Sequence, residues 1–212
     1  MARAILILSA AVTLLAASAC NVVSPVFYAI HGPEKILPKF TLDPDASTVI
    51  LVDDPANTVG TRRLRADIAS ATTRILLDRE LVIDMIDPRP ALALASHTGG
   101  EDPMSITEIG REVDADVVIY VLLTEFQVAN AEGSALPSAA AQVKIMDVRE
   151  GRRVFPDDPR GVAVRLRPEH RAADIGADST RELALEREQA QRLGLAIAQL
   201  FYKHEVPDSA TR

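Results

Sequence analysis

The stretch that decides the fold is Ala115–Val128, "ADVVIYVLLTEFQV". It is strongly apolar and rich in β-branched residues, which pack well on a buried, pleated surface. A strand of this kind is buried on both faces, so we expect it near the centre of a sheet. The segments on either side of it should supply the neighbouring strands and the helices that cover them.

Upstream of this stretch, strand-like and helix-like patterns alternate. "TVILVDD", Thr48–Asp54, is a short apolar run and predicts a buried strand. Apolar residues at spacings of three and four predict a helix over Arg62–Arg79, and "LVIDMI", Leu81–Ile86, predicts a second strand that Pro88 ends. Strands that alternate with helices favour parallel pairing.

Two shorter helices are expected before the central strand. Pro90–Ala95 predicts a brief helix. "SITEIGREVD" then carries a capping box, in which Ser105 accepts from a backbone amide and Glu108 reaches back to the start of the helix.

Downstream, the pattern changes to antiparallel pairing. Apolar and polar residues alternate over Ala139–Val148, which predicts a half-exposed strand, and "REG" followed by "RRVFP" predicts a hairpin. Gly161–Pro168 adds an edge strand, and a long helix is expected from about Thr180 to Tyr202, with Ser179 as its cap. The sequence therefore predicts a single α/β domain. Its sheet is mixed and mostly parallel, an antiparallel hairpin follows, helices pack on the sheet, and a long helix ends the chain.

The N-terminal segment has a different character. Arg3 precedes "AILILSAAVTLLAASA", a run about as long as the apolar part of a secretory signal and short for a membrane span. Small residues end the run, and Cys20, the single cysteine of the chain, follows them. This arrangement resembles the lipobox of bacterial lipoproteins, although the leucine usual three positions before the cysteine is replaced by Ala17.

The lipobox resemblance implies that Cys20 is a lipid attachment point. In that family the thiol receives diacylglycerol, the signal is cleaved before the cysteine, and the new amine is acylated, for example with palmitate. Several buried acyl chains hold a protein on a membrane. The alternatives are an ordinary signal peptide with an incidental cysteine, or an uncleaved anchor. We expect a protein that faces the periplasm, and Asn21 favours the outer membrane over the inner one because Asp at that position is the inner-membrane retention signal of enteric bacteria.

These patterns divide the chain into four parts. The expected parts are a signal peptide over residues 1–19, a lipid-anchored, proline-rich tether over 20–46, an α/β periplasmic domain over 47–205 and a disordered tail over 206–212.

Composition excludes several classes of partner. The net charge is −7, and the sequence has no block of lysine and arginine of the kind that forms a phosphate-binding surface. We therefore expect no nucleic-acid binding. Tryptophan is absent, which argues against a sugar-stacking site. The sequence predicts no cofactor and no metal, because the four histidines are widely separated. The expected partners are the membrane, through the N-terminal lipid, and an envelope protein or further copies of this chain.

The order of strands and helices also resembles a group of periplasmic lipoproteins. The group includes the curli-secretion channel lipoprotein, exopolysaccharide-export ring lipoproteins and the N-terminal domain of the Tol-system translocation protein. Asp114-Ala115-Asp116-Val117 stands where the group has "gaD-v", and Asp147 with Gly151 matches its "D-x-x-T-G" hairpin. The chain also looks like planctomycete-type lipoproteins that share a "GPxK" segment, here Gly32 to Lys35.

The resemblance covers Thr48–Phe155 and implies a subunit of an envelope transport or secretion complex. Tyr120 stands near the place of a glycine that is usual in the third strand of the group. An amphipathic hairpin pair is also missing, so the resemblance does not imply a transmembrane pore.

Three carboxylates are the candidate ligand-binding residues. Asp53 and Asp54 end the first strand, where open α/β sheets bind ligands, and Asp84 lies in the expected second strand. The alternative, which we favour for "DDPANT", is a turn or capping role. We expect a non-catalytic accessory subunit. The other hypotheses are a metal-dependent envelope hydrolase that uses these carboxylates and a small-ligand-binding module that uses the "SHTGGEDP" loop.

Overall fold

The structure is a computed structural model that describes residues 35–59, 61–96, 104–128, 137–166 and 179–205, with the backbone alone at 179–181. Its contacts divide the chain into two units. The larger unit is Pro38–Tyr202. In the smaller unit, which takes in both ends of the chain, β1 (Lys35–Ile36) pairs antiparallel with β7 (His204–Glu205).

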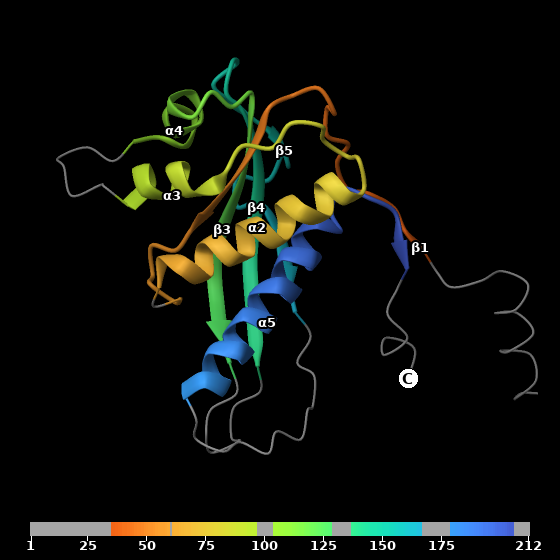
Figure 1. Ribbon diagram of the computed structural model, residues 1–212. Coiled ribbons are helices and arrows are strands. Elements are labelled where there is room, and N and C mark those ends of the chain that lie inside the picture. Colours follow the sequence, from red (N-terminus) through yellow and green to blue (C-terminus); the bar gives the residue numbers. More distant parts are fainter. Residues whose placement is uncertain (1–34, 60, 97–103, 129–136, 167–178, 206–212) are drawn as a thin grey trace, which may run out of the picture. The chain divides into compact units, whose positions relative to one another are not determined.

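The larger unit is built on a five-stranded mixed sheet, with β3 and β4 as its inner strands (Figure 1). The strands are β2 (Thr48–Asp53), β3 (Val117–Gln127), β4 (Ser138–Asp147), β5 (Arg152–Phe155) and β6 (Val162–Arg165). β2 pairs parallel with β3 and β3 pairs antiparallel with β4, while β5 and β6 both pair antiparallel with the far edge of β4. The predicted mixed α/β fold is confirmed, but the prediction that the sheet is mostly parallel is wrong. Among the strands of the described residues, only the β2–β3 pair is parallel, because Leu81–Ile86, which is predicted to add another parallel strand, forms a single bridge instead.

Four helices pack around this sheet within the described residues. They are α2 (Arg62–Asp78), α3 (Pro88–Ser96), α4 (Ile106–Glu112) and α5 (Ser179–Ala198). α2 and α5 lie against each other and cross one face of the sheet, whereas α3 and α4 lie towards one end of the larger unit (Figure 1). None of the helices in the described part of the chain is long and apolar enough to cross a membrane.

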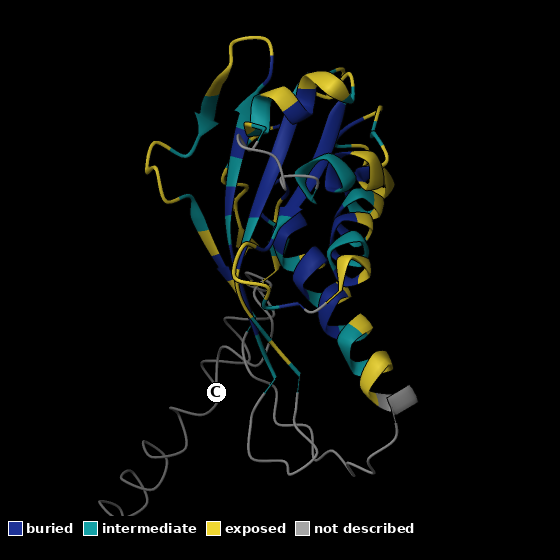
Figure 2. Ribbon diagram, turned by 90° about the vertical axis from the view of Figure 1, so that its left-hand side faces the viewer, coloured by how far each residue is buried: buried dark blue, intermediate teal, exposed yellow. Residues whose placement is uncertain are grey.

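The core lies between the sheet and the two long helices, where Figure 2 shows the buried residues gathered. The register places alternate residues of β2, β3 and β4 on one face, and those residues are fully buried: Ile50, Val52, Ile119, Val121, Val143 and Ile145. On the opposite face of β4, Gln142 and Lys144 are half-buried. The alternation predicted for this strand is confirmed.

The two long helices approach closely at a glycine. A Cβ on Gly194 of α5 would lie 2.7 Å from the Ala71 Cβ and 3.0 Å from the Ile68 carbonyl oxygen of α2. The hydroxyl of Thr72 lies within hydrogen-bonding distance of the carbonyl oxygens of Ile68, at 3.0 Å, and of Gly194, at 3.2 Å. Thr72 is therefore a buried polar residue whose hydroxyl is satisfied by both helices.

The predicted strand over Leu81–Ile86 is wrong. Only a single parallel bridge forms, between Met85 and Thr48, supported by backbone hydrogen bonds from the Thr48 amide to Asp84 and from the Ile86 amide to Thr48. The Ile83 amide bonds to Pro44 instead, and the Ile83 side chain is 72% exposed. The apolar run resembles a strand, but its backbone turns away from β2 after one contact.

The local signals for the other elements are confirmed. Both hydrogen bonds of the Ser105–Glu108 capping box are present at the start of α4. The β4–β5 hairpin turns through Gly151, whose φ of 65° is open to glycine at no steric cost. α5 ends at Ala198, and the chain turns before Leu200. Five apolar residues of the last predicted helix are nevertheless buried along one side: Ala190, Leu193, Ile197, Leu200 and Phe201.

Candidate functional site

The predicted carboxylate Asp54 holds a turn together at the carboxyl end of β2. Its Oδ1 accepts hydrogen bonds of 2.8 Å from both the amide and the hydroxyl of Thr58, and its Oδ2 accepts one of 2.8 Å from the Val59 amide. The residue is only 7% exposed. Both oxygens are thus engaged by the chain's own donors, which is the turn role proposed as the alternative from the sequence.

Asp53 faces a neighbouring strand. The Tyr120 hydroxyl of β3 donates a hydrogen bond of 2.7 Å to Asp53 Oδ2. Burial raises the pKa of Tyr120, and the hydrogen bond and charge of Asp53 raise it further, so the phenol stays protonated and acts as a donor. The Lys144 ammonium of β4 lies 5.9 Å from the centre of the Tyr120 ring, which makes a line of polar groups across three strands.

Asp84 does not join the other two carboxylates. Its backbone carbonyl accepts from the amide of Thr48, the first residue of β2, and its side chain is exposed. Asp53 is the last residue of β2, so at about 3.3 Å per residue the two positions are roughly 16 Å apart along the strand. The structure therefore keeps Asp53 and Asp54 as neighbours but separates Asp84 from them.

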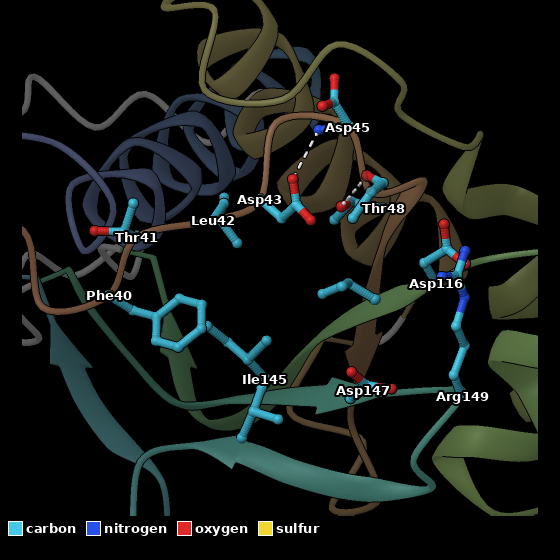
Figure 3. A pocket seen from close by; sticks show the side chains of 13 residues that line it. Phe40, Thr41, Leu42, Asp43, Asp45, Thr48, Asp116, Ile145, Asp147 and Arg149 are labelled. Atoms are coloured by element: carbon cyan, nitrogen blue, oxygen red, sulfur yellow. Dashed lines mark hydrogen bonds and ion pairs between the residues drawn. The ribbon is translucent and has the colours of Figure 1, made fainter.

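A cavity that sequence reasoning missed lies at the other end of β2. Its volume is about 510 Å³, and we call it the acidic cavity. Four carboxylates surround it: Asp43, Asp45, Asp116 and Asp147. Its apolar walls come from Phe40, Leu42, Val117, Ile145 and Val154. Figure 3 shows Asp43 and Asp45 on one side of the opening and Asp147 on the opposite side.

The segment before β2 forms one wall of the acidic cavity. Leu42 is buried, and the Phe40 ring packs on Phe155 of β5 with the ring centres 5.2 Å apart. The Lys39 amide donates a 2.7 Å hydrogen bond to the Leu200 carbonyl, close after α5. The apolar residues of this segment therefore attach it to the domain. The spacing of Asp43 and Asp45 in "LDPDA" carries no sequence signal that would place them opposite Asp147.

Asp116 is the most strongly held carboxylate of the acidic cavity. Its Oδ1 forms a 2.6 Å ion pair with Arg149, and its Oδ2 accepts from the Ser47 amide at 3.2 Å and the Ser47 hydroxyl at 3.3 Å. Burial raises the pKa of Asp116, but the Ser47 hydrogen bonds and the Arg149 guanidinium outweigh this and hold the pKa below its ordinary value.

Two other carboxylates of this cavity are also bonded within the chain. Asp43 Oδ1 accepts from the Asp45 amide at 3.1 Å, and Asp147 Oδ1 accepts from the Glu150 amide at 2.7 Å. Among the described residues, no group of three or more histidine, cysteine or acidic residues is placed to hold a metal ion. The carboxylates of Asp43, Asp116 and Asp147 therefore stabilise turns and strand ends.

Several predicted residues lie outside the described part of the chain. They are Cys20, His31, His97, His170, the "HTGGEDP" part of the predicted loop and the tail after residue 205. The side chain of Ser179, predicted to cap the last helix, also lies outside it.

No family model matches the sequence, and no curated protein matches it. Solved structures similar to this chain include three bacterial proteins. The PelC dodecamer from Paraburkholderia phytofirmans has a TM-score of 0.47 at 12% identity, over 80% of this chain and 96% of that one. Lipoprotein GNA1162 from Neisseria meningitidis has a TM-score of 0.38 at 11% identity, over 71% and 96%. The C-terminal domain of LpoB from Salmonella enterica has a TM-score of 0.34 at 20% identity, over 58% and 84%. Because every TM-score is below 0.5, these likenesses assign this chain neither an activity nor a partner.

Proposed function

We propose that this protein is a periplasm-facing lipoprotein, anchored in a membrane through Cys20, that serves as a non-catalytic accessory subunit of an envelope transport or secretion complex. The observation that carries the proposal is the position of the single cysteine, directly after Ala17, Ser18 and Ala19 at the end of an apolar run. A thiol used for lipid attachment needs no partner for a disulfide.

The state of the predicted carboxylates supports a non-catalytic role. A general acid or base needs a carboxylate within hydrogen-bonding reach of substrate. Asp54 uses both oxygens to bond Thr58 and Val59, and Asp53 accepts from Tyr120. A hydrolase built on Asp53, Asp54 and Asp84 would also need the third carboxylate close to the first two, and Asp84 lies near the opposite end of β2.

The anchor is tested by replacing the cysteine. In Cys20→Ser the thiol is lost and the side chain remains small and polar, so the protein should leave the membrane fraction or remain as an unprocessed precursor. Ser18→Ala, which keeps a small residue before the cysteine, is the matched control and should fractionate like the wild type. Mass spectrometry of the mature N-terminus reads the added acyl chains directly. A membrane fraction unchanged by Cys20→Ser, with no acyl mass, would disprove the anchor.

The accessory role is tested by affinity purification of the wild-type protein from mildly solubilised membranes, with stoichiometry by mass spectrometry. Co-purification with transport or secretion components at a fixed ratio is the expected result. Recovery of the protein alone, under conditions that keep a known envelope complex intact, would contradict the accessory role without bearing on the anchor.

A further inference from the structure

A second cavity lies between the first turns of α2 and the start of α3. Its volume is about 430 Å³, which is within the usual size of small-molecule sites. We call it the arginine groove, after Arg62, Arg63 and Arg89, which line it together with Asp67, Asp87 and Leu92. Leu92 is fully buried and gives the groove an apolar floor, whereas the arginines are exposed.

One arginine of the groove is already neutralised. Arg89 forms a 2.7 Å ion pair with Asp87, and its Nε donates to both Asp87 oxygens at 3.0 Å. The hydrogen bonds from Arg89 hold the pKa of Asp87 below its ordinary value, so the carboxylate is ionised and the pair carries no net charge. The remaining charge of the groove therefore comes from Arg62, Arg63 and Asp67.

Arg62 and Arg63 have no counter-charge among the described residues. Neither forms an ion pair with any residue that the structure describes. Both lie in the first turn of α2, which holds no acidic residue. The N-terminal end of a helix has a positive potential, so two cations at this place are unfavourable. A bound anion would offset both the potential of the helix and the charge of the arginines. The fold alone gives no reason for this arrangement, because acidic residues would suit the same turn better.

Asp67 lies one turn further along α2 and lines the same groove. It forms no hydrogen bond or ion pair with the described residues, even though Arg63 stands four positions before it, a spacing that commonly pairs such side chains. Its Oδ2 atom is buried without a donor. A partly buried carboxylate without a donor is unfavourable, and a ligand that brings a donor to this carboxylate relieves that cost.

We propose that the arginine groove binds a small zwitterionic ligand of the phosphoethanolamine type, with its anionic group on Arg62 and Arg63 and its ammonium group on Asp67. The charges match: two uncompensated guanidinium groups face a phosphate, and one uncompensated carboxylate faces an ammonium. Leu92 packs under the carbon atoms that join them. This ligand class follows from the groove alone and does not depend on how the protein is anchored.

The test is titration calorimetry of the full-length protein in detergent with phosphoethanolamine and with phosphocholine. Both ligands carry a phosphate and a positive nitrogen, but the choline nitrogen has no N–H to donate. Phosphoethanolamine should bind at one site per chain and about tenfold more tightly than phosphocholine, the factor expected from one hydrogen bond between charged groups. Absence of binding by phosphoethanolamine would overturn the proposal.

Two variants separate the roles of the groove residues. Arg62→Ala/Arg63→Ala should lose at least tenfold in affinity for both ligands. The matched control is Arg74→Ala/Arg187→Ala, which removes the same charge at exposed positions outside the groove and should bind as the wild type does. Asp67→Asn should remove most of the preference for phosphoethanolamine over phosphocholine. Equal loss in the control, or an unchanged preference in Asp67→Asn, would contradict the assignment; circular dichroism confirms that each variant is folded.

The same headgroup chemistry occurs in a free solute and in a phospholipid. Repeating the titration in micelles that contain phosphatidylethanolamine should abolish the heat of phosphoethanolamine binding if a lipid headgroup occupies the groove, while phosphatidylcholine micelles leave it unchanged. If neither lipid changes the heat, the natural ligand is a free solute.

Discussion

The acidic cavity and the arginine groove both gather charged side chains around an apolar surface, but the chain treats these charges differently. In the acidic cavity, Asp43, Asp116 and Asp147 accept hydrogen bonds from nearby amides, and Arg149 pairs with Asp116. In the arginine groove, Arg62, Arg63 and Asp67 have no such partners among the described residues. Charged groups that the fold satisfies are explained by the fold. Groups that it leaves unsatisfied are the better evidence for a ligand.

The largest expected change in the free energy of unfolding comes from a substitution in the wall of the acidic cavity. Leu42 is 6% exposed in the segment before β2, so Leu42→Ala should lower the free energy of unfolding by about 3 kcal/mol, the usual cost of emptying a buried leucine site. Ile83→Ala, at a position 72% exposed, is the control and should change it by less than about 0.5 kcal/mol. Urea denaturation followed by circular dichroism measures both. Equal, small effects would mean that the segment is not part of the folded domain.

The next largest effect concerns Asp116 of the acidic cavity, whose contribution to the free energy of unfolding should depend on pH. The pKa of Asp116 is lower in the folded protein than its ordinary value of 3.8. Its contribution to stability is therefore fully present above that value and is lost as the pH falls through the folded pKa. Asp116→Asn should be less stable than the wild type at pH 6, and the difference should shrink at pH 3.

The control for this prediction is Asp45→Asn in the same cavity, because the Asp45 carboxylate accepts no hydrogen bond from the described residues. Asp45→Asn should have about the same free energy of unfolding as the wild type at both pH values. A gap between the wild type and Asp116→Asn that stays constant with pH would show that the Ser47 and Arg149 contacts do not stabilise the charged form.

The opposite result is expected for the carboxylate of the arginine groove. Without ligand, Asp67→Asn removes a charge that no described group compensates, so the free energy of unfolding should stay within about 0.5 kcal/mol of the wild type or rise. Urea denaturation of the ligand-free protein at pH 7 measures it. A clear loss of stability would mean that Asp67 is a structural residue, like Asp116, and would remove the contrast between the two regions.

A small increase in the free energy of unfolding is expected from a substitution in the first turn of α2. Arg62→Glu replaces a cation by an anion at the first residue of α2, near the positive end of the helix, and should raise the free energy of unfolding by roughly 0.3–1 kcal/mol at low salt. Arg74→Glu, near the other end of α2, should give no gain. Thermal denaturation at low and high salt tests this, because the gain should fall as salt screens the charges. A loss of stability in Arg62→Glu would show that Arg62 has a structural partner.

The sequence by itself determined the elements whose signals are local. The apolar, β-branched runs became β2 and β3, the alternation of Ala139–Val148 became β4, and the Ser105 capping box begins α4. Each of these signals needs only neighbouring residues, because a strand's faces alternate and a helix caps its own first turn. The turn role of Asp54 was also within reach, since Thr58 and Val59 are close to it in the chain.

Only the tertiary structure decided which segments pair and which charges meet. Leu81–Ile86 has the composition of a strand, yet its strand pairing with the described residues is limited to one bridge to Thr48, because pairing depends on where α2 and α3 lead the chain. The same holds for the two cavities. Asp43 and Asp147 come from distant segments that the sheet brings to one end. Arg89 lines the same groove as Arg63 and Asp67 because α3 returns beside α2, and no spacing within a single element encodes that arrangement.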